Sequence, residues 1–213
     1  MGMDRREALS YTVLSQALIM YLSLFSWTDV MKSIHSGEIA MHLLKPVSLF
    51  SYWFAQDIGR ALAALLLRGL SLLLICSFFY DLTLPTSLTQ LGLFFLALTL
   101  SGVVSFCYRF LSNLAAFWTA NARGIIRFTT VLSFLCSGFL MPLRLFPEWL
   151  QSIIYLTPFP YMMDSCIEIY LGLLSGGEIA RAFLNQLIWI ALLLVANQLV
   201  LRRGLRKLGV LGG

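Results

Sequence analysis

The sequence predicts an all-α, polytopic membrane protein with about five transmembrane helices of about 20 residues each. Of its 213 residues, 59% are hydrophobic and 12% are charged, and the mean hydropathy is +0.84. Such values are typical of membrane proteins rather than of soluble domains. The net charge of +5 does not indicate nucleic-acid binding, because Lys and Arg gather on the cytoplasmic side of membrane proteins. We therefore expect one transmembrane domain over residues 1–213, surrounded by lipid.

The apolar stretches that are long enough to cross a bilayer set the expected spans. The range 49–80 begins with an aromatic and polar part that suits the membrane interface, and its continuation over 61–80 is the part that crosses. The expected spans are residues 9–30, 49–80, 91–111, 124–141 and 183–201.

The range 36–46, between the first two spans, predicts a short amphipathic helix. Ser36 suits its N-cap, and Glu38 then lies in the first turn, where the helix dipole favours an acid. Lys45 falls in the last turn, where a cation is favoured, and Pro46 stops the helix.

This helix has an apolar and a polar face. Ile39 and Leu43 share one face, whereas Glu38, His42 and Lys45 share another. A protein that only had to cross the bilayer would need no such element, but one that docks a soluble partner would.

The range 142–177 is apolar but contains helix breakers and charges. Its prolines include Pro142, Pro147 and Pro158. This range fits a re-entrant hairpin better than a span. In such a hairpin two short helices enter the membrane and leave it on the same side, and protein or water forms hydrogen bonds with the free backbone groups.

The basic residues set the expected orientation. We place the tail, 202–213, in the cytoplasm, and the range 36–46 then lies on the same side, with the re-entrant hairpin outside. Five spans would leave the N-terminus outside with Arg5 and Arg6. We therefore expect that one preceding span is missing from this chain, and a genuine five-span form is the alternative.

Four charges lie within or near the expected spans: Asp57, Arg60, Arg68 and Arg109. Charges inside a bilayer are costly and face a partner or a cavity. One interpretation is interhelical pairing with snorkelling towards the interface, and the other is a substrate path. The spans lack the set of acids that proton-driven carriers use, which weakens the interpretation as a secondary carrier.

No motif in the chain indicates catalysis. The run L-S-G-G-E at 174–178 resembles the signature of ABC ATPases, but the chain has no phosphate-binding loop, so a turn before the last helix is the better interpretation. The four cysteines are isolated, and His35 and His42 lack a partner at ligand spacing, so we expect no metal site. We expect no enzyme activity and no cofactor bound by this chain.

The segment I-H-S-G-E-I at 34–39, followed by L-L-K-P-V-S at 43–48, resembles the cytoplasmic segment of ABC-2-type transporter permease subunits. The similarity extends over nearly the whole chain, and it is strongest to the bacterial branch that includes drug and viologen exporters. Further similar runs are D-I-G-R at 57–60, A-F-W-T at 116–119, S-G-F-L-M-P at 137–142, F-P-E-W-L at 146–150, P-F at 158–159, I-Y-L-G at 169–172 and R-R-G at 202–204. Family members usually carry one more N-terminal span.

The resemblance implies an exporter permease in the bacterial cytoplasmic (inner) membrane. Two such subunits, identical or related, would pair around a central path, and each would contact a separate ATPase that binds ATP and Mg. The implied coupling helix carries Gly37, Glu38, Ile39, His42, Leu43, Lys45 and Pro46. Ile39 and Leu43 would fill a groove on the ATPase, and the polar residues would contact its edge. The alternative is a secondary carrier or membrane assembly factor with no ATPase partner.

Overall fold

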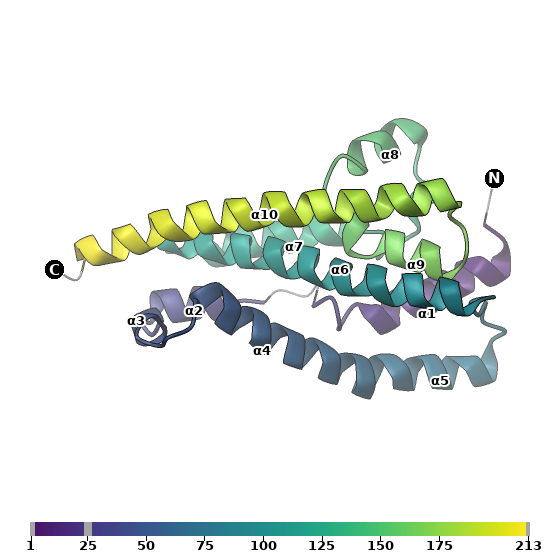
Figure 1. Ribbon diagram of the computed structural model, residues 1–213, viewed down its shortest axis with the longest axis horizontal. Helices are drawn as coiled ribbons and strands as arrows, with labels where there is room; N and C mark the ends of the chain where they lie inside the picture. The colour runs from purple at the N-terminus through teal and green to yellow at the C-terminus, as the bar shows by residue number, and fades with distance from the viewer. Residues whose placement is uncertain (1–2, 24–26, 212–213) are drawn as a thin grey trace.

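The computed structural model describes residues 3–23 and 27–211, and these form helices and turns arranged as an elongated bundle (Figure 1). The α-helices are α1 Arg5–Leu18, α2 Asp29–His35, α3 Ile39–Leu43, α4 Leu49–Ala64, α5 Leu70–Phe79, α6 Leu88–Leu114, α7 Ala122–Cys136, α8 Glu148–Ile154, α9 Asp164–Tyr170 and α10 Gly176–Leu211. The π-helix η1, Leu65–Gly69, joins α4 to α5, and the 3-10 helices are η2 Ala115–Phe117, η3 Leu143–Leu145 and η4 Pro160–Met162. The predicted all-helical class is confirmed.

Three helices in the described part of the chain are long and apolar enough to cross a membrane: Leu49–Phe79, Leu88–Phe117 and Gly176–Lys207. They contain most of the predicted spans 49–80, 91–111 and 183–201. The predicted spans 9–30 and 124–141 instead correspond to shorter helices.

The first predicted span, 9–30, is not one continuous helix. Helix α1 ends at Leu18, a turn follows, and α2 begins at Asp29. Ser23 has a φ of 49°, which is uncommon for a residue with a side chain and takes the chain out of the helical path. Helices α1 and α2 lie towards opposite ends of the bundle (Figure 1). The segment is therefore broken between them, although residues 24–26 lie outside the described part.

The second short helix, α7, ends at Cys136, whereas the predicted span ran to residue 141. Gly138 follows with a φ of 83°, a conformation that glycine adopts without a steric penalty. The Tyr11 hydroxyl donates a hydrogen bond to the Gly138 carbonyl at 2.9 Å. A turn against α1 therefore replaces the last part of the predicted span.

Helix α6 is the central element of the bundle and packs against α2, α7, α9 and α10. Aromatic side chains fill the space between α6 and α4. The ring of Phe50 lies 5.3 Å from those of both Phe106 and Phe110, and the ring of Trp27 lies 5.9 Å from that of Phe106. This cluster fixes α4 and the start of α2 on one face of α6.

The two ends of the bundle differ. Helices α2 and α3 and the C-terminal end of α10 lie at one end, and α8, α9 and the start of α1 lie at the other (Figure 1). The predicted tail, 202–213, is not a separate segment, because α10 continues through Leu211.

The helix Leu49–Phe79 presents a largely uncovered face. In the most apolar stretch of this helix only 6% of the residues are buried. The side chains of Phe78 and Phe79 are 86% and 77% exposed. This face suits contact with lipid or with another membrane helix.

Gly69 allows a close backbone approach between η1 and α1. A Cβ at this position would lie 2.8 Å from the carbonyl oxygen of Ala17. We expect Gly69→Ala to lower the stability of the bundle by about 1–3 kcal/mol, because the added methyl group forces the two helices apart. Equilibrium unfolding in mixed detergent micelles measures the change.

Gly59→Ala is the matched control, since a Cβ there meets no atom within 4 Å and alanine favours the helix. If Gly69→Ala and Gly59→Ala were equally stable, the close approach of η1 to α1 would be contradicted.

Candidate functional site

The broken segment between α1 and α2 is held by polar side chains of α6. The Ser105 hydroxyl donates to the carbonyl of Leu22 at 2.6 Å. The Asn113 amide donates to the carbonyl of Trp27 at 2.9 Å, and its oxygen accepts from the backbone N–H of Met31 at 3.1 Å. Because an unpaired backbone group is costly in an apolar environment, these contacts allow a helix break inside the bundle.

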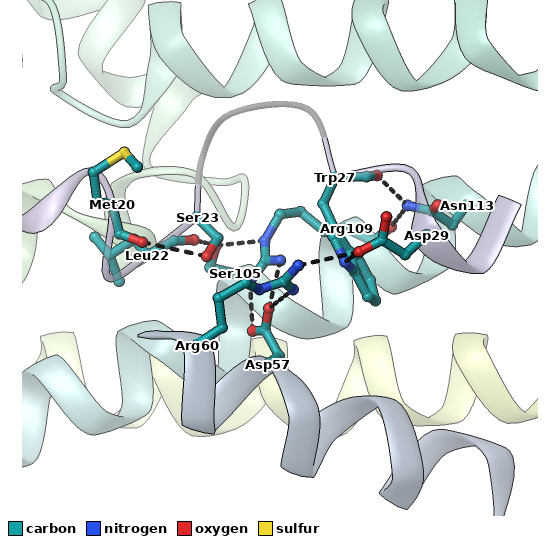
Figure 2. Close-up of polar contacts among 10 residues, drawn as sticks. All are labelled: Met20, Leu22, Ser23, Trp27, Asp29, Asp57, Arg60, Ser105, Arg109 and Asn113. Atoms are coloured by element: carbon teal, nitrogen blue, oxygen red, sulfur yellow. Dashed lines mark hydrogen bonds and ion pairs between the residues drawn. The ribbon is translucent and has the colours of Figure 1, made fainter. Parts of the chain in front are cut away.

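A buried ion pair lies next to this break (Figure 2). The two terminal guanidinium nitrogens of Arg109, Nη1 and Nη2 on α6, donate to the carboxylate of Asp57, on α4, at 3.1 and 2.8 Å. Asp57 is 4% exposed and Arg109 is 8% exposed. Two parallel hydrogen bonds fix orientation as well as distance, so this pair sets the position of α4 against α6.

The pair extends towards α2 through a second arginine. Arg60 donates to Asp57 at 2.8 Å and to Asp29 at 3.2 Å. The Trp27 indole N–H donates to Asp29 at 3.0 Å, and its ring lies 5.4 Å from Arg60 and 5.5 Å from Arg109. We call Trp27, Asp29, Asp57, Arg60 and Arg109 the polar cluster. It contains two acids and two arginines, Lys32 also lies 3.6 Å from Asp29, and the cluster joins α2, α4 and α6.

The structure brings together Asp57, Arg60 and Arg109 but not Arg68. The Arg68 side chain is exposed, and it makes no hydrogen bond or ion pair with any described residue. In an uninterrupted α-helix Asp57 and Arg68 would be about three turns apart on one face. The wider turn of η1, which contains Arg68, changes that register.

The predicted amphipathic helix is shorter than the range 36–46, since α3 spans Ile39–Leu43. Ser36 ends α2, and Gly37 makes the turn into α3 with a φ of 77°. Ile39 is 1% exposed, so the expectation that it fills a groove on a partner is wrong. Its side chain anchors α3 to the chain's own core instead.

Other apolar residues take the outward position on this segment. Met41 is 66% exposed, Leu43 47%, Leu44 83% and Val47 52%. We call these four residues the α3 tip. The sequence pattern indicated only Leu43 among them, because it placed Ile39 and Leu43 on one apolar face, and Leu44 and Val47 lie after the end of α3.

The predicted polar face of this segment lies partly against α4. The His42 ring lies 4.5 Å from that of Tyr52, and the Lys45 ammonium lies 4.7 Å above the Tyr52 ring. Glu38 and Pro46 are exposed. His42 and Lys45 therefore hold α3 on α4, while the α3 tip remains free.

At the opposite end, a buried aspartate joins α1 to the expected re-entrant hairpin. Asp164 is fully buried and accepts hydrogen bonds from the hydroxyls of Tyr11, at 2.7 Å, and Tyr155, at 2.9 Å, and from the backbone N–H of Leu143 at 3.3 Å. Sequence reasoning missed this contact, and the only signal was an acid within an apolar run. Pro142 and Pro147 come directly before η3 and α8, and Pro158 lies in the turn after α8.

These features define a multi-pass helical membrane protein with a polar cluster between its helices and an exposed apolar tip at one end. Residues 1–212 match the model of the ABC-2 family transporter protein family. The chain belongs to this family, and it is accordingly a permease of an ABC-type transporter, a class that in general associates with an ABC ATPase. The comparison with curated proteins found no match.

The polar cluster makes a testable contribution to stability. In Asp57→Asn, the buried Arg109 loses its counter-charge beside a second arginine, so we expect the free energy of unfolding to fall by about 3–5 kcal/mol. Equilibrium unfolding in mixed micelles measures it, and replacing both Asp57 and Arg109 by leucine should restore much of the loss.

Asp81→Asn is the charge-matched control. Asp81 is 3.7 Å from Arg6 in an exposed pair, and such pairs contribute little. If Asp57→Asn were as stable as Asp81→Asn, the stabilising role of the buried pair of Asp57 and Arg109 would be contradicted.

Proposed function

We propose that this chain is the transmembrane subunit of an exporter that moves its substrate outward across the bacterial cytoplasmic membrane, powered by ATP and Mg on a separate ATPase. The observation that carries the proposal is the α3 tip, together with the membership of the family. Four exposed apolar side chains, Met41 and Leu43 on the short α3 and Leu44 and Val47 just after it, form a surface that suits a soluble partner.

The charge distribution supports a cytoplasmic position for the α3 tip. Arg202, Arg203, Arg206 and Lys207 lie in the last part of α10, at the same end of the bundle as α3 (Figure 1). Since basic residues favour the cytoplasmic side, the α3 tip and the C-terminus would face the cytoplasm. The end with α8 and α9 would then face outward.

The contacts described above provide a route from the α3 tip to the spans. Ile39 ties α3 to the core, and Lys45 and His42 tie it to α4. Helix α2 connects α3 to the polar cluster, which joins α4 and α6. When ATP binding draws two ATPase subunits together, a force on the α3 tip would move these helices as one unit.

The transporter requires a second permease subunit, identical or related, to complete a path between two bundles. The uncovered face of Leu49–Phe79 and the exposed side of α7, with Ile125, Phe128 and Val131, are available for that contact or for lipid. A secondary carrier or an assembly factor is the alternative function, and it would show no dependence on ATP and no role for the α3 tip.

A charge on the α3 tip should separate this subunit from its ATPase. In Leu44→Asp, the most exposed residue of the tip becomes charged while the fold keeps its core. We expect the ATPase to be lost, or reduced at least about tenfold, in a tagged pull-down from native membranes in mild detergent, as for other central apolar contact residues. Mass spectrometry of the bound proteins measures the ratio.

Leu88→Asp is the matched control, because Leu88 is 86% exposed at the opposite end of the bundle. It should retain the ATPase at the ratio of the unchanged protein. An ATPase that stays bound to Leu44→Asp, or no ATPase with the unchanged protein, would overturn the coupling role of α3.

A further inference from the structure

Helix α10 has one side that is packed against the bundle. The side-chain amides of Gln186 and Asn197, on this side, donate hydrogen bonds to backbone carbonyls of α6 at 3.2 and 2.9 Å. Further along the helix, Gly204 is buried so closely against Phe117 that a Cβ at this position would overlap the phenyl ring. Because these positions are separated by nearly whole helical turns, they lie on one face, and the opposite face of α10 points away from the bundle.

The opposite face of α10 carries an apolar stripe. Its residues recur every three or four positions, as the side chains of one helix face do, and all of them are exposed: Leu184, Ile188, Leu192, Val195 and Leu199. The part from 188 to 199 is about 16 Å long at 1.5 Å per residue. That length is about half of the 30 Å hydrocarbon core of a bilayer, so the stripe matches the acyl chains of one leaflet.

The same face becomes basic directly after the stripe. Arg203 follows Leu199 by one helical turn, and the exposed cations of this part are Arg202, Arg203, Arg206 and Lys207. None of these four side chains forms an ion pair or hydrogen bond with another residue of 3–23 or 27–211. Helix α10 carries no acid after Glu178. We call the stripe and the four cations together the uncovered face of α10.

We propose that the uncovered face of α10 binds an anionic phospholipid, with an acyl chain along the apolar stripe and the headgroup phosphate on Arg202, Arg203 and Arg206. A phospholipid has the same order of an apolar chain followed by a charged group, and clusters of four or more cations directly after a span attract anionic lipids. The cations lie at the same end of the bundle as α3 (Figure 1). In the orientation proposed above, the lipid belongs to the cytoplasmic leaflet.

Two other occupants fit this face less well. A soluble acidic protein would meet the four cations but not the apolar stripe, which lies within the spanning part of α10. A second copy of this chain, related by two-fold symmetry and contacting the same face, would bring two sets of four cations together, and like charges repel. The lipid is therefore the occupant that matches both parts of the face.

The test uses the purified full chain in detergent and native mass spectrometry, which counts the lipids that remain bound. Phosphatidylglycerol, which is anionic, is compared with zwitterionic phosphatidylcholine of the same acyl chains. We expect the Kd of phosphatidylglycerol to be at least about tenfold lower, because several cations act on one net negative charge. Raising ammonium acetate from about 50 to about 500 mM should reduce this preference by screening.

The double variant Arg202→Gln/Arg203→Gln should raise the Kd of phosphatidylglycerol at least about tenfold and leave that of phosphatidylcholine unchanged. Both arginines are exposed, so the fold is retained. The matched control is Arg5→Gln/Arg181→Gln, which removes two exposed arginines at the opposite end of the bundle (Figure 1). It should bind phosphatidylglycerol as the unchanged protein does. This test needs neither ATP nor an ATPase, so its outcome is separate from that of the proposed function.

Four results would each overturn the proposal. The first is equal binding of the two lipids by the unchanged protein, and the second is an unaltered phosphatidylglycerol Kd in Arg202→Gln/Arg203→Gln. The third is an equal loss of binding in Arg5→Gln/Arg181→Gln, which would show attraction to positive charge anywhere on the protein. The fourth is displacement of phosphatidylglycerol by about 10 mM inorganic phosphate, which would assign the cations to a free anion rather than to a lipid.

Discussion

The need to pair polar groups inside an apolar bundle is the constraint on which the rest of the structure depends. The break between α1 and α2 exposes backbone groups, and Ser105 and Asn113 of α6 satisfy them. Burying the Asp57 carboxylate without a partner would be costly, and Arg109, which also lies on α6, forms an ion pair with it. One helix therefore supplies the partners for both features, which places the break and the polar cluster side by side (Figure 2).

This arrangement also joins the two ends of the molecule. The α3 tip continues through α2 into the polar cluster, and the other part of the broken segment, α1, reaches Asp164 through Tyr11.

The sequence was sufficient for the class of fold and for the three long helices, and it offered pairing of Asp57 with a nearby arginine as one of two interpretations. It was not sufficient for the break in 9–30, because hydropathy records how apolar a segment is and not whether α6 offers partners to its backbone. It placed Ile39 outward because periodicity identifies an apolar face but not whether a partner or the protein's own core covers that face, and in the structure the core covers Ile39. Arg68 lies within an expected span, but it is on the uncovered face of Leu49–Phe79 and is exposed.

We propose that the α3 tip contacts an ABC ATPase from the cytoplasmic side. The most direct measurement places a photo-cross-linking amino acid at position 44 in native membranes and identifies the captured proteins by mass spectrometry. We expect an adduct with an ABC ATPase from position 44 and none from position 88, at the opposite end. Capture of the ATPase from position 88 alone, or of no ATPase from position 44 in membranes that contain one, would contradict it.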